Sequence, residues 1–423
     1  MDRWRAALRP ALPLATNHLG GDDKVTPQLI SVVTSTVAQQ TARPPWWRDI
    51  RILRVVVQVA ATAVIGLILY VLWFNLTNNM RRIGIELGFD FLQQPVGVSV
   101  TGSDISAGSA VWRALVVGIK NTFALVVVGL PLLTIIGVLV GVARLSTNWL
   151  VAKAATIYVE TLRNIPPLLV ILVAFFVGIL PLPTIQDPVE IFDLAIVNNR
   201  FIAVTGFTAN PGFSNFMWIM LGALVVAAIV WRWRTAVFDA SGKPHHRVLW
   251  SLGVMLGLGV VGFLVIGRPF ELSKPVLDGR VLTGGYSGLG GYFAMLIALV
   301  LYTASHVAEI VRGSILAVPK GQTEAANALA LSGFQRLRHV TLPQAMRIAL
   351  PPTINQYLNY VKNTSLGIAV GYSEVTLIAF QAVGNGRPAP QMVLILMASY
   401  LLFSLVISAV VNVLNRRLQL VTQ

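Results

Sequence analysis

The 423-residue sequence contains no cysteine, which excludes disulfide bonds and thiolate metal sites. It is also poor in charge: Asp, Glu, Lys and Arg make up 12% of the residues, about half the share found in a typical soluble domain. Hydrophobic residues account for 55%, and the mean hydropathy is +0.72. This combination indicates an integral membrane protein.

Several sequence patterns are also missing. No apolar run alternates with period two, so membrane β-barrel strands are not expected and the spans should be helical. There is no G-x-x-x-x-G-K-[ST] loop to hold nucleotide phosphates, and no HExxH or GxSxG motif. Neither ATP hydrolysis nor intramembrane enzyme chemistry is therefore expected of this chain. Residues 1–50 carry charges but no continuous apolar core, which favours a cytoplasmic tail over a cleaved signal peptide.

Eight apolar runs are long enough to cross a bilayer as helices of about 20 residues. They cover roughly residues 53–75, 117–143, 151–180, 215–231, 248–266, 288–311, 344–366 and 391–413. The expected fold is an all-α integral membrane protein with about eight transmembrane helices. Residues 51–423 would form the transmembrane domain.

The net charge of +15 is spread over the short segments between the apolar runs. This distribution argues against a nucleic-acid-binding face and for charge that sets membrane orientation. With the N-terminus placed in the cytoplasm, segments on that side carry 21 Lys and Arg residues and segments on the other side carry 8. Both termini, and the polar segment 319–343, are therefore expected in the cytoplasm.

Two pairs of glycines, each four residues apart, occur within predicted spans. They are Gly137 with Gly141 and Gly253 with Gly257. Such pairs allow two helix backbones to approach closely. We interpret both as packing sites rather than as a dimerisation signal.

Residues 319–343 are too polar to lie in lipid, yet they connect two predicted spans. The run "TEAANALAL" is rich in strong helix formers, and "SGFQ" fits a capping box with Ser332 as N-cap and Gln335 three residues later. A short helix is expected to end near Ala330, and a second to begin at Gly333 and stop at Pro343. These two helices would form a rigid hairpin; the alternative is an ordinary connecting loop.

The sequence of this hairpin resembles a known family. The run "EAANALALSGFQRLRHVTLPQA" resembles the EAA loop, which docks ABC-transporter permeases on their ATP-binding subunits. "AEIVRGSILAVPKGQ", "LPPTINQYLNYVKNTSLGIAV", "NTFALVVVGLPLLTIIGVLVGVARLS" and "YVETLRNIPPLLVIL" resemble the polar and general L-amino-acid uptake branch, including the glutamate/glutamine/aspartate/asparagine type. The resemblance covers about residues 117–180 and 287–420.

The resemblance implies a five-span type I ABC importer core, to which this chain adds an N-terminal span and an inserted pair near 215–266. It implies a permease subunit of the bacterial inner membrane that moves amino acids into the cytoplasm. The implied partners are two ATP-binding subunits that use ATP and Mg, a second permease subunit in a heterodimer, a periplasmic amino-acid-binding protein and membrane lipid. No cofactor and no nucleic acid is expected on this chain. The outer segments 76–116 and 181–214 are candidates for contact with the binding protein.

Within this reading, the hairpin couples the spans to the ATP-binding subunits. Glu324 is expected in the first turn of the first helix, where the helix dipole favours a negative charge. Ala325 and Ala326 are expected to leave room for close approach to a partner groove. The candidate coupling residues are Glu324, Ala325, Ala326, Ala330, Ser332, Gly333 and Pro343.

Ala330 departs from the family pattern, which usually has glycine at this position of the loop. Glycine adopts a left-handed turn without steric cost, whereas alanine does not. We therefore expect the bend to have shifted to Ser332 and Gly333.

Polar residues within two spans are candidates for a translocation pathway, because such groups are costly in lipid and usually face protein or water. Glu160 and Arg163 stand three residues apart on one helix, where they can pair. Each segment also holds a proline pair, Pro166–Pro167 or Pro351–Pro352, and broken helices often line transporter sites. The candidates are Glu160, Arg163, Asn164, Asn355, Asn359, Lys362, Asn363, Thr364 and Ser365.

Structural alternatives remain for both sets. The Glu160–Arg163 pair could be a neutral latch between spans, and the polar stripe on 355–363 could serve only packing. An ion-coupled secondary amino-acid transporter is the alternative function; it would need an acidic residue or histidine at the membrane midplane. Glu160 already has an arginine beside it, and His306 and Glu309 lie near the cytoplasmic edge.

Overall fold

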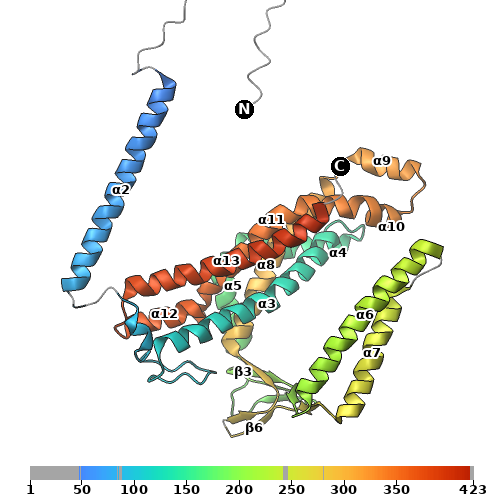
Figure 1. The fold of residues 1–423 in the computed structure, drawn as a ribbon, viewed down its shortest axis with the longest axis horizontal. Helices are drawn as coiled ribbons and strands as arrows, with labels where there is room; N and C mark the ends of the chain where they lie inside the picture. The colour runs from blue at the N-terminus through green and yellow to red at the C-terminus, as the bar shows by residue number, and fades with distance from the viewer. Residues whose placement is uncertain are drawn as a thin grey trace, which may run out of the picture. The chain divides into compact units, whose positions relative to one another are not determined.

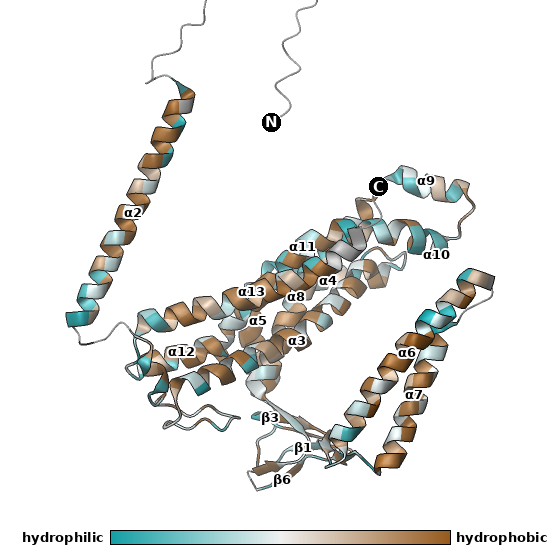
Figure 2. Cartoon of the chain, in the orientation of Figure 1, coloured by the Kyte–Doolittle hydropathy of each residue, from teal (hydrophilic) through white to brown (hydrophobic). Residues whose placement is uncertain are grey.

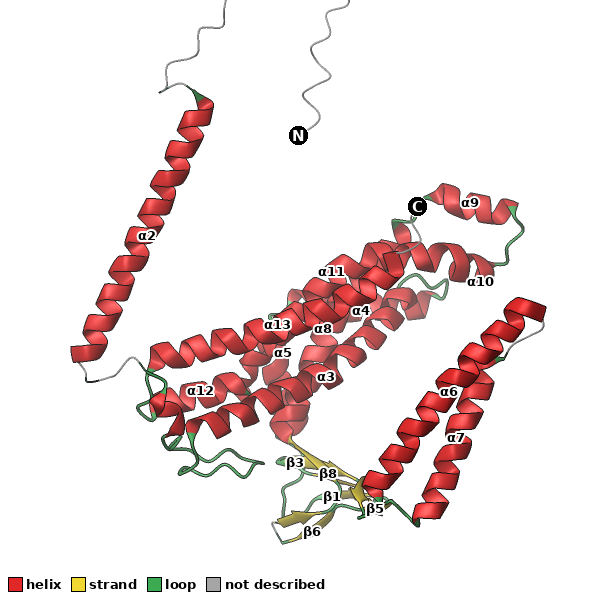
Figure 3. Ribbon diagram, in the orientation of Figure 1, coloured by secondary structure: helices red, strands yellow, loops and turns green. Residues whose placement is uncertain are grey.

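The computed structural model describes residues 47, 49–82, 84, 88–241, 246–279 and 281–419, without the side chains of 51, 241 and 414–419. The expected tail, residues 1–50, lies almost entirely outside them. The chain divides into two compact units, residues 1–87 and 88–423. Long helices dominate, and the strands are short (Figures 1 and 3).

The first unit consists of one long helix, α2 (Ile50–Arg82). Its 33 residues would extend about 50 Å at 1.5 Å per residue, more than a hydrocarbon core requires. Apolar side chains on all sides of the helix are exposed. A helix that is apolar all round is typical of a membrane span.

The second unit is built around α8 (Gly290–Leu316), which packs against α3, α4, α5 and α11. A polar hairpin follows α8, and hydrophilic residues are prominent on its two short helices (Figure 2). The other helices of this unit are η1 (Asp90–Gln93), α3 (Val111–Ala143), α4 (Trp149–Asn164), α5 (Pro167–Val173), η2 (Ala174–Ile179), α6 (Phe213–Ser241), α7 (Arg247–Ile266), α9 (Lys320–Ala328), α10 (Gly333–Arg336), η3 (Leu337–Thr341), α11 (Leu342–Asn363), η4 (Thr364–Val370), α12 (Val375–Gly384) and α13 (Ala389–Gln419).

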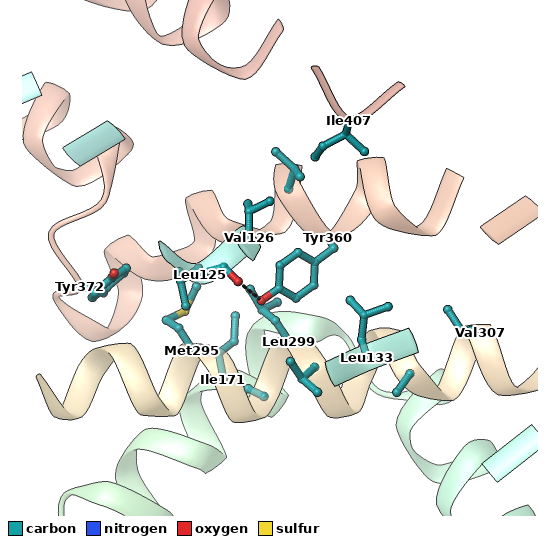
Figure 4. Packing of buried hydrophobic residues seen from close by; sticks show 14 of the residues in the cluster. Leu125, Val126, Leu133, Ile171, Met295, Leu299, Val307, Tyr360, Tyr372 and Ile407 are labelled. Atoms are coloured by element: carbon teal, nitrogen blue, oxygen red, sulfur yellow. Dashed lines mark hydrogen bonds between the residues drawn. The ribbon is translucent and has the colours of Figure 1, made fainter. Parts of the chain in front are cut away.

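Large apolar side chains from α3, α8 and α11 meet in the main core (Figure 4). Leu125, Met295, Leu299 and Tyr360 are completely buried there. The Tyr360 hydroxyl donates a hydrogen bond of 3.0 Å to the carbonyl of Leu125, so its one polar atom is satisfied. This bond joins α11 to α3 within the core.

The prediction of about eight helical spans is confirmed. Within the described residues, six helices are long and apolar enough to cross a membrane, and two bent helix pairs raise the number to as many as eight. α4 and α5 meet at 110° where Pro166 and Pro167 begin the second helix, so this proline pair does break its segment. Pro351 and Pro352 instead lie within the continuous helix α11. The 48° bend in that span comes later, before α12.

Short strands, which the sequence analysis did not predict, lie before α6 at residues 189–209 and after α7 at residues 270–289. β1 (Val189–Ile191), β2 (Ala195–Val197), β3 (Phe201–Val204) and β8 (Tyr286–Leu289) form an antiparallel sheet in that order. β6 (Val276–Asp278) pairs with β7 (Val281–Thr283). Because β8 leads directly into α8 and the polar hairpin follows α8, the sheet and the hairpin lie at opposite ends of that helix (Figure 1).

The inserted pair of spans, α6 and α7, emerges from a strand pair. β4 (Gly206–Ala209) precedes α6 and β5 (Phe270–Ser273) follows α7, and the two strands pair with Ala209 opposite Phe270. The Phe270 ring lies edge-on to the rings of Phe207, Phe216 and Phe263 at centroid distances of 5.4, 5.8 and 5.3 Å. This aromatic cluster ties the first turn of α6 and the last turn of α7 to the strands.

The two glycine pairs behave differently. A β-carbon at Gly137 would lie 2.7 Å from Val307 and one at Gly141 would lie 2.6 Å from the Ala308 carbonyl, so this pair packs α3 on α8 as expected. No atom lies within 4 Å of a β-carbon built at Gly253 or Gly257. The expectation of close packing is therefore wrong for the second pair within this chain, because its face of α7 is open.

Candidate functional site

The polar hairpin is formed by α9 and α10, and its predicted cap is confirmed. The Ser332 hydroxyl accepts a hydrogen bond from the Gln335 backbone N–H at 3.3 Å, and the Gln335 side-chain oxygen accepts one from the Ser332 N–H at 2.9 Å. This reciprocal pair satisfies two backbone donors at the start of α10. The Asn327 side chain accepts a hydrogen bond of 2.7 Å from Arg336, which braces α9 against α10.

The bend after α9 lies at Ala330, not at Ser332 and Gly333 as expected. Ala330 adopts a left-handed backbone with φ of 55°. The N–H of Leu331 bonds to the Ala326 carbonyl and the N–H of Ala330 to the Asn327 carbonyl, the two bonds of a Schellman motif. These bonds terminate α9 in a left-handed geometry that glycine would adopt at lower cost. The two hydrogen bonds therefore keep Ala330 in a strained backbone conformation.

Replacement of Ala330 by glycine is therefore expected to stabilise the end of α9 by about 1 kcal/mol, because glycine removes the β-carbon strain of the left-handed turn. Hydrogen exchange of the α9 amides should slow about fivefold. The matched control is Ala325→Gly, at an exposed position inside the helix, which should destabilise α9 by about 1 kcal/mol. Equal effects of the two substitutions would show that the left-handed turn carries no strain.

Pro343 does not end the second helix, contrary to the prediction. α10, η3 and α11 run on as one helical segment, with Pro343 in the first turn of α11. η3 is a single π turn, in which the N–H of Leu342 bonds to the Leu337 carbonyl. A π turn accommodates a residue that interrupts the regular bonding, and proline is such a residue because it has no N–H. The hairpin is thus rigidly continuous with α11.

Two expectations about the surface of α9 are corrected. Glu324 is the fifth residue of α9, beyond the first turn, where the helix dipole has little effect. Ala326 is 2% exposed and is packed within this chain, so it is not on the docking surface. Ala325 is exposed. The most exposed large apolar side chains of the hairpin are those of Leu329 and Phe334, at 75% and 69%.

A cluster of charges lies where α3, α4 and the last turns of α8 meet. Glu309 accepts hydrogen bonds from Arg312 at 2.6 and 3.1 Å and forms an ion pair with Arg144. Arg163 lies 3.9 Å from Glu309, and Glu160 lies 3.9 Å from Arg144. The structure thus brings Glu160 and Arg163 into one cluster through Glu309 and Arg144 rather than as a direct pair.

Glu309 is the centre of this cluster; the sequence analysis placed it near the cytoplasmic edge but did not count it among the site residues. The Arg144 side chain is 11% exposed and that of Glu309 is 25% exposed, so their charges are largely shielded from water. Asn164, the third candidate on α4, donates a hydrogen bond of 2.7 Å to the backbone carbonyl of Glu160. The available sequence signal was the spacing of Glu309 and Arg312, three residues apart on one helix.

The candidate residues on α11 and η4 divide into an exposed and an enclosed group. Asn355, Asn359 and Lys362 are exposed, and their side chains make no hydrogen bond or ion pair with any residue that the structure describes. Asn363 is half-buried. The hydroxyl of Thr364, which is buried, donates a hydrogen bond of 2.7 Å to the Val361 carbonyl. The Ser365 hydroxyl donates one of the same length to the Lys362 carbonyl.

The opposite face of α11 packs into the protein. The hydroxyls of Tyr357 and of Thr134 on α3 share a hydrogen bond of 2.8 Å. The Tyr360 hydroxyl donates a hydrogen bond to the carbonyl of Leu125, which is also on α3. α11 therefore presents an exposed polar stripe on one face while the other is fixed to α3. Within a membrane span, unpaired amide and ammonium groups require water or a second protein rather than lipid.

The break between η4 and α12 contains a buried carboxylate that the sequence analysis also missed. Glu374 is fully buried; it accepts hydrogen bonds from the Leu377 N–H at 2.8 Å and from the Tyr400 hydroxyl at 2.9 Å. It therefore caps α12 and ties it to α13. An acidic residue directly before the apolar run "VTLIAF" was the local signal for this cap.

Comparison with known proteins gives the family. Residues 133–420 match the binding-protein-dependent transport system inner membrane component family. The chain is 39% identical over 363 residues to the general L-amino acid transport system permease protein AapQ of Rhizobium johnstonii, covering 85% of this chain and 90% of that protein. It is 35% identical over 366 residues to the putative amino-acid ABC transporter permease protein YhdX of Escherichia coli, covering 86% and 93%.

A third relative is the glutamate/glutamine/aspartate/asparagine transport system permease protein BztB of Rhodobacter capsulatus. It is 34% identical over 381 residues, which cover 82% of this chain and 89% of that protein. These matches confirm the resemblance first recognised in the hairpin and its flanking spans. The chain belongs to the family of inner-membrane permease components of binding-protein-dependent ABC transport systems.

Proposed function

We propose that this chain is a permease subunit of an ABC importer that moves amino acids into the cytoplasm. In this proposal, ATP hydrolysis takes place on two separate ATP-binding subunits that use ATP and Mg, and the chain itself has no catalytic site. Its relatives, named as permeases for general L-amino acids and for glutamate, glutamine, aspartate and asparagine, support the substrate class. Both termini would lie in the cytoplasm, on the side of the hairpin.

The observation that carries the proposal is the hairpin of α9 and α10. It exposes Leu329 and Phe334 on either side of a fixed bend, and its second helix continues into α11 without a flexible linker. Exposed apolar side chains on a rigid, otherwise polar element suit a groove on another protein. Movement of that partner would be transmitted to α8 and α11, the two helices that the hairpin joins.

Loss of both apolar side chains is expected to release the ATP-binding subunits. The double substitution Leu329→Ser with Phe334→Ser should weaken docking by about 2 kcal/mol or more, because central apolar anchors dominate such interfaces. Co-purification of the ATP-binding subunits with the tagged permease measures the effect.

The matched control is Phe192→Ser. Phe192 is 90% exposed at the turn between β1 and β2, and those strands lie at the other end of α8 from the hairpin. Its replacement should leave co-purification unchanged. Retention of the ATP-binding subunits by the hairpin variant would rule out this hairpin as the docking element.

The translocation pathway is proposed to run along the exposed polar face of α11. Asn355, Asn359 and Lys362 offer amide and ammonium groups that suit the carboxylate and amine of an amino acid. A second, different permease subunit would close this face from lipid and complete the path. Asn363, Thr364 and Ser365 would then lie at its end, and Glu160, Arg163 and Asn164 on α4 would border it.

The outer strands are proposed to meet the periplasmic amino-acid-binding protein. Phe192 projects from the β1–β2 turn with φ of 50°, and Asp193 beside it has φ of 56°. A bulky residue in this conformation is uncommon, and its 90% exposed ring supports a contact with another protein.

Reconstitution tests the proposed function against ion-coupled transport. The permease with its ATP-binding and binding-protein partners is placed in proteoliposomes and supplied with a panel of labelled amino acids. Uptake should require internal ATP and Mg and should persist when proton and sodium gradients are dissipated. Uptake by the permease alone, driven by an ion gradient, would overturn the proposal in favour of a secondary transporter.

A further inference from the structure

A cavity of about 300 Å³ lies beside β8, the last strand of the four-stranded sheet. Ligand sites in proteins begin at about this volume, and a free amino acid fits within it. Because β8 leads into α8, the cavity lies at the end of that helix opposite the hairpin. Its walls include Ile185, Arg200, Phe201, Leu282, Ser287 and Leu289.

One wall of the cavity is apolar. Phe201 of β3 stands opposite Leu289 of β8, and Ala203 stands opposite Ser287. Opposed residues share a face of the sheet, and so do alternate residues of one strand, so all four lie on the same side. Phe201 is buried there in a small apolar cluster, against which Leu282 packs. The cavity therefore combines a hydrocarbon surface with the hydroxyl of Ser287.

Arg200 supplies a positive charge at the cavity. Among the described residues that form the walls, it alone is charged. Its side chain is exposed and makes no hydrogen bond, ion pair or ring contact with any residue that the structure describes. Its backbone is fixed, because its N–H donates to the Asn198 side-chain oxygen and its carbonyl accepts from the Gly290 N–H, both at 2.9 Å. The guanidinium donors are therefore free to form a bidentate pair with a carboxylate.

Ser287 supplies acceptor oxygens in the same cavity. The bond between Gly290 and Arg200 identifies the backbone groups of β8 that face β3. Since paired and unpaired residues alternate along an antiparallel strand, the Ser287 carbonyl points away from β3, toward the free edge of the sheet. The Ser287 hydroxyl makes no hydrogen bond within the described part of the chain. Both oxygens can accept a hydrogen bond from an ammonium group.

These groups together match one class of ligand. A carboxylate suits Arg200, an ammonium suits the oxygens of Ser287, and an uncharged side chain suits the apolar wall. An acidic side chain would need a second cation, which the described walls lack. An inorganic anion would leave the apolar wall without a partner.

We propose that this cavity is a receiving site for a free amino acid with an uncharged side chain, whose carboxylate binds Arg200 at the outer surface of the permease. The amino acid would occupy the site after leaving the binding protein and before entering the path along α11. The inference rests on the proposed function for the substrate class and for the outward position of the sheet. It adds a site on the strands that flank the inserted pair of helices.

Direct binding to the full-length chain tests the site. The permease is placed in lipid nanodiscs without its partners, and tritiated L-leucine is titrated in a scintillation proximity assay. Arg200→Gln should weaken the affinity for leucine about tenfold, because the charge-assisted pair with the carboxylate is lost. Arg200→Lys keeps the charge but not the planar fork, and should weaken it about threefold. L-Leucinamide, which has no carboxylate, should compete about tenfold less well than unlabelled leucine.

Arg268→Gln is the matched control, and it should leave the affinity for leucine unchanged. Arg268 lies directly before β5, is exposed and has no side-chain partner among the described residues, but it does not line the cavity. Unchanged affinity in Arg200→Gln, an equal loss in Arg268→Gln, or full competition by leucinamide would each overturn the site. Unchanged leucine affinity in Arg200→Gln with weaker capture of the binding protein would assign Arg200 to a protein contact instead.

Uptake by the reconstituted transporter is a separate readout. ATP-driven leucine uptake without leucine binding to this chain would overturn the receiving site and leave the proposed function standing. Arg200-dependent binding without ATP-driven uptake of any amino acid would support the site and count against the proposed function.

Discussion

Replacement of Gly141 by leucine is expected to eliminate most of the folded protein, whereas Gly257→Leu is expected to be tolerated. A β-carbon at Gly141 would lie 2.6 Å from the Ala308 carbonyl and 2.8 Å from Val311, so the backbones of α3 and α8 would have to separate. Overpacking of this kind costs about 1–3 kcal/mol when side chains can yield, and more when the obstacle is backbone. Because α8 is the central helix, its displacement would affect every helix packed on it.

The measurement is the yield and thermal stability of the permease by size-exclusion chromatography. Gly257→Leu is the control, because both glycines lie within predicted spans and belong to the same sequence pattern, yet Gly257 faces open space. Equal loss of folded protein with both substitutions would indicate that the Gly253–Gly257 face is also closely packed, against a partner chain.

Glu309→Gln is expected to destabilise the permease by about 3–5 kcal/mol and to abolish uptake. The substitution keeps the size of the side chain but removes the negative charge shared by Arg144, Arg163 and Arg312. Arg144 would suffer most, because its side chain is only 11% exposed and its remaining acidic neighbour, Glu160 at 3.9 Å, is itself 67% exposed and compensates the buried charge poorly. Arg163 and Arg312 are more exposed and can be solvated.

Removal of the buried partner tests this explanation. The double variant Glu309→Gln with Arg144→Gln should recover most of the lost thermal stability, since the remaining arginines, Arg163 and Arg312, are exposed enough to be solvated. Asp104→Asn is the control, because its 2.9 Å pair with Arg113 is exposed and should contribute about 0–1 kcal/mol. Failure of the double variant to recover stability would mean that Glu309 acts through its own packing rather than through Arg144.

The features that the sequence predicted correctly depend on nearby residues. The spans are long apolar runs, and the Ser332–Gln335 capping box joins groups three residues apart. The break at Pro166 and Pro167 follows from the missing N–H groups of proline itself. In each case the determining interaction lies within one helical turn or one continuous segment.

The features that the sequence analysis missed depend on distant residues or on local competition. The Arg144–Glu309 pair joins residues 165 positions apart, and β3 pairs with β8 across the whole inserted segment. Strands of three or four residues are also too short to show an alternating pattern. At Ala330, steric preference argued against a left-handed turn, but two backbone hydrogen bonds at the end of α9 outweighed it.

Because β4 pairs with β5, the α6–α7 helix pair can be inserted into or deleted from a chain of this family as one segment. Ala209 and Phe270 stand opposite each other, so the 60 residues between them leave the rest of the protein and return to it at a single point. A tight two-residue turn could join the same two strands in their place. Gain or loss of the two helices together would leave the order of all later helices unchanged. Each later helix would also keep its direction across the membrane.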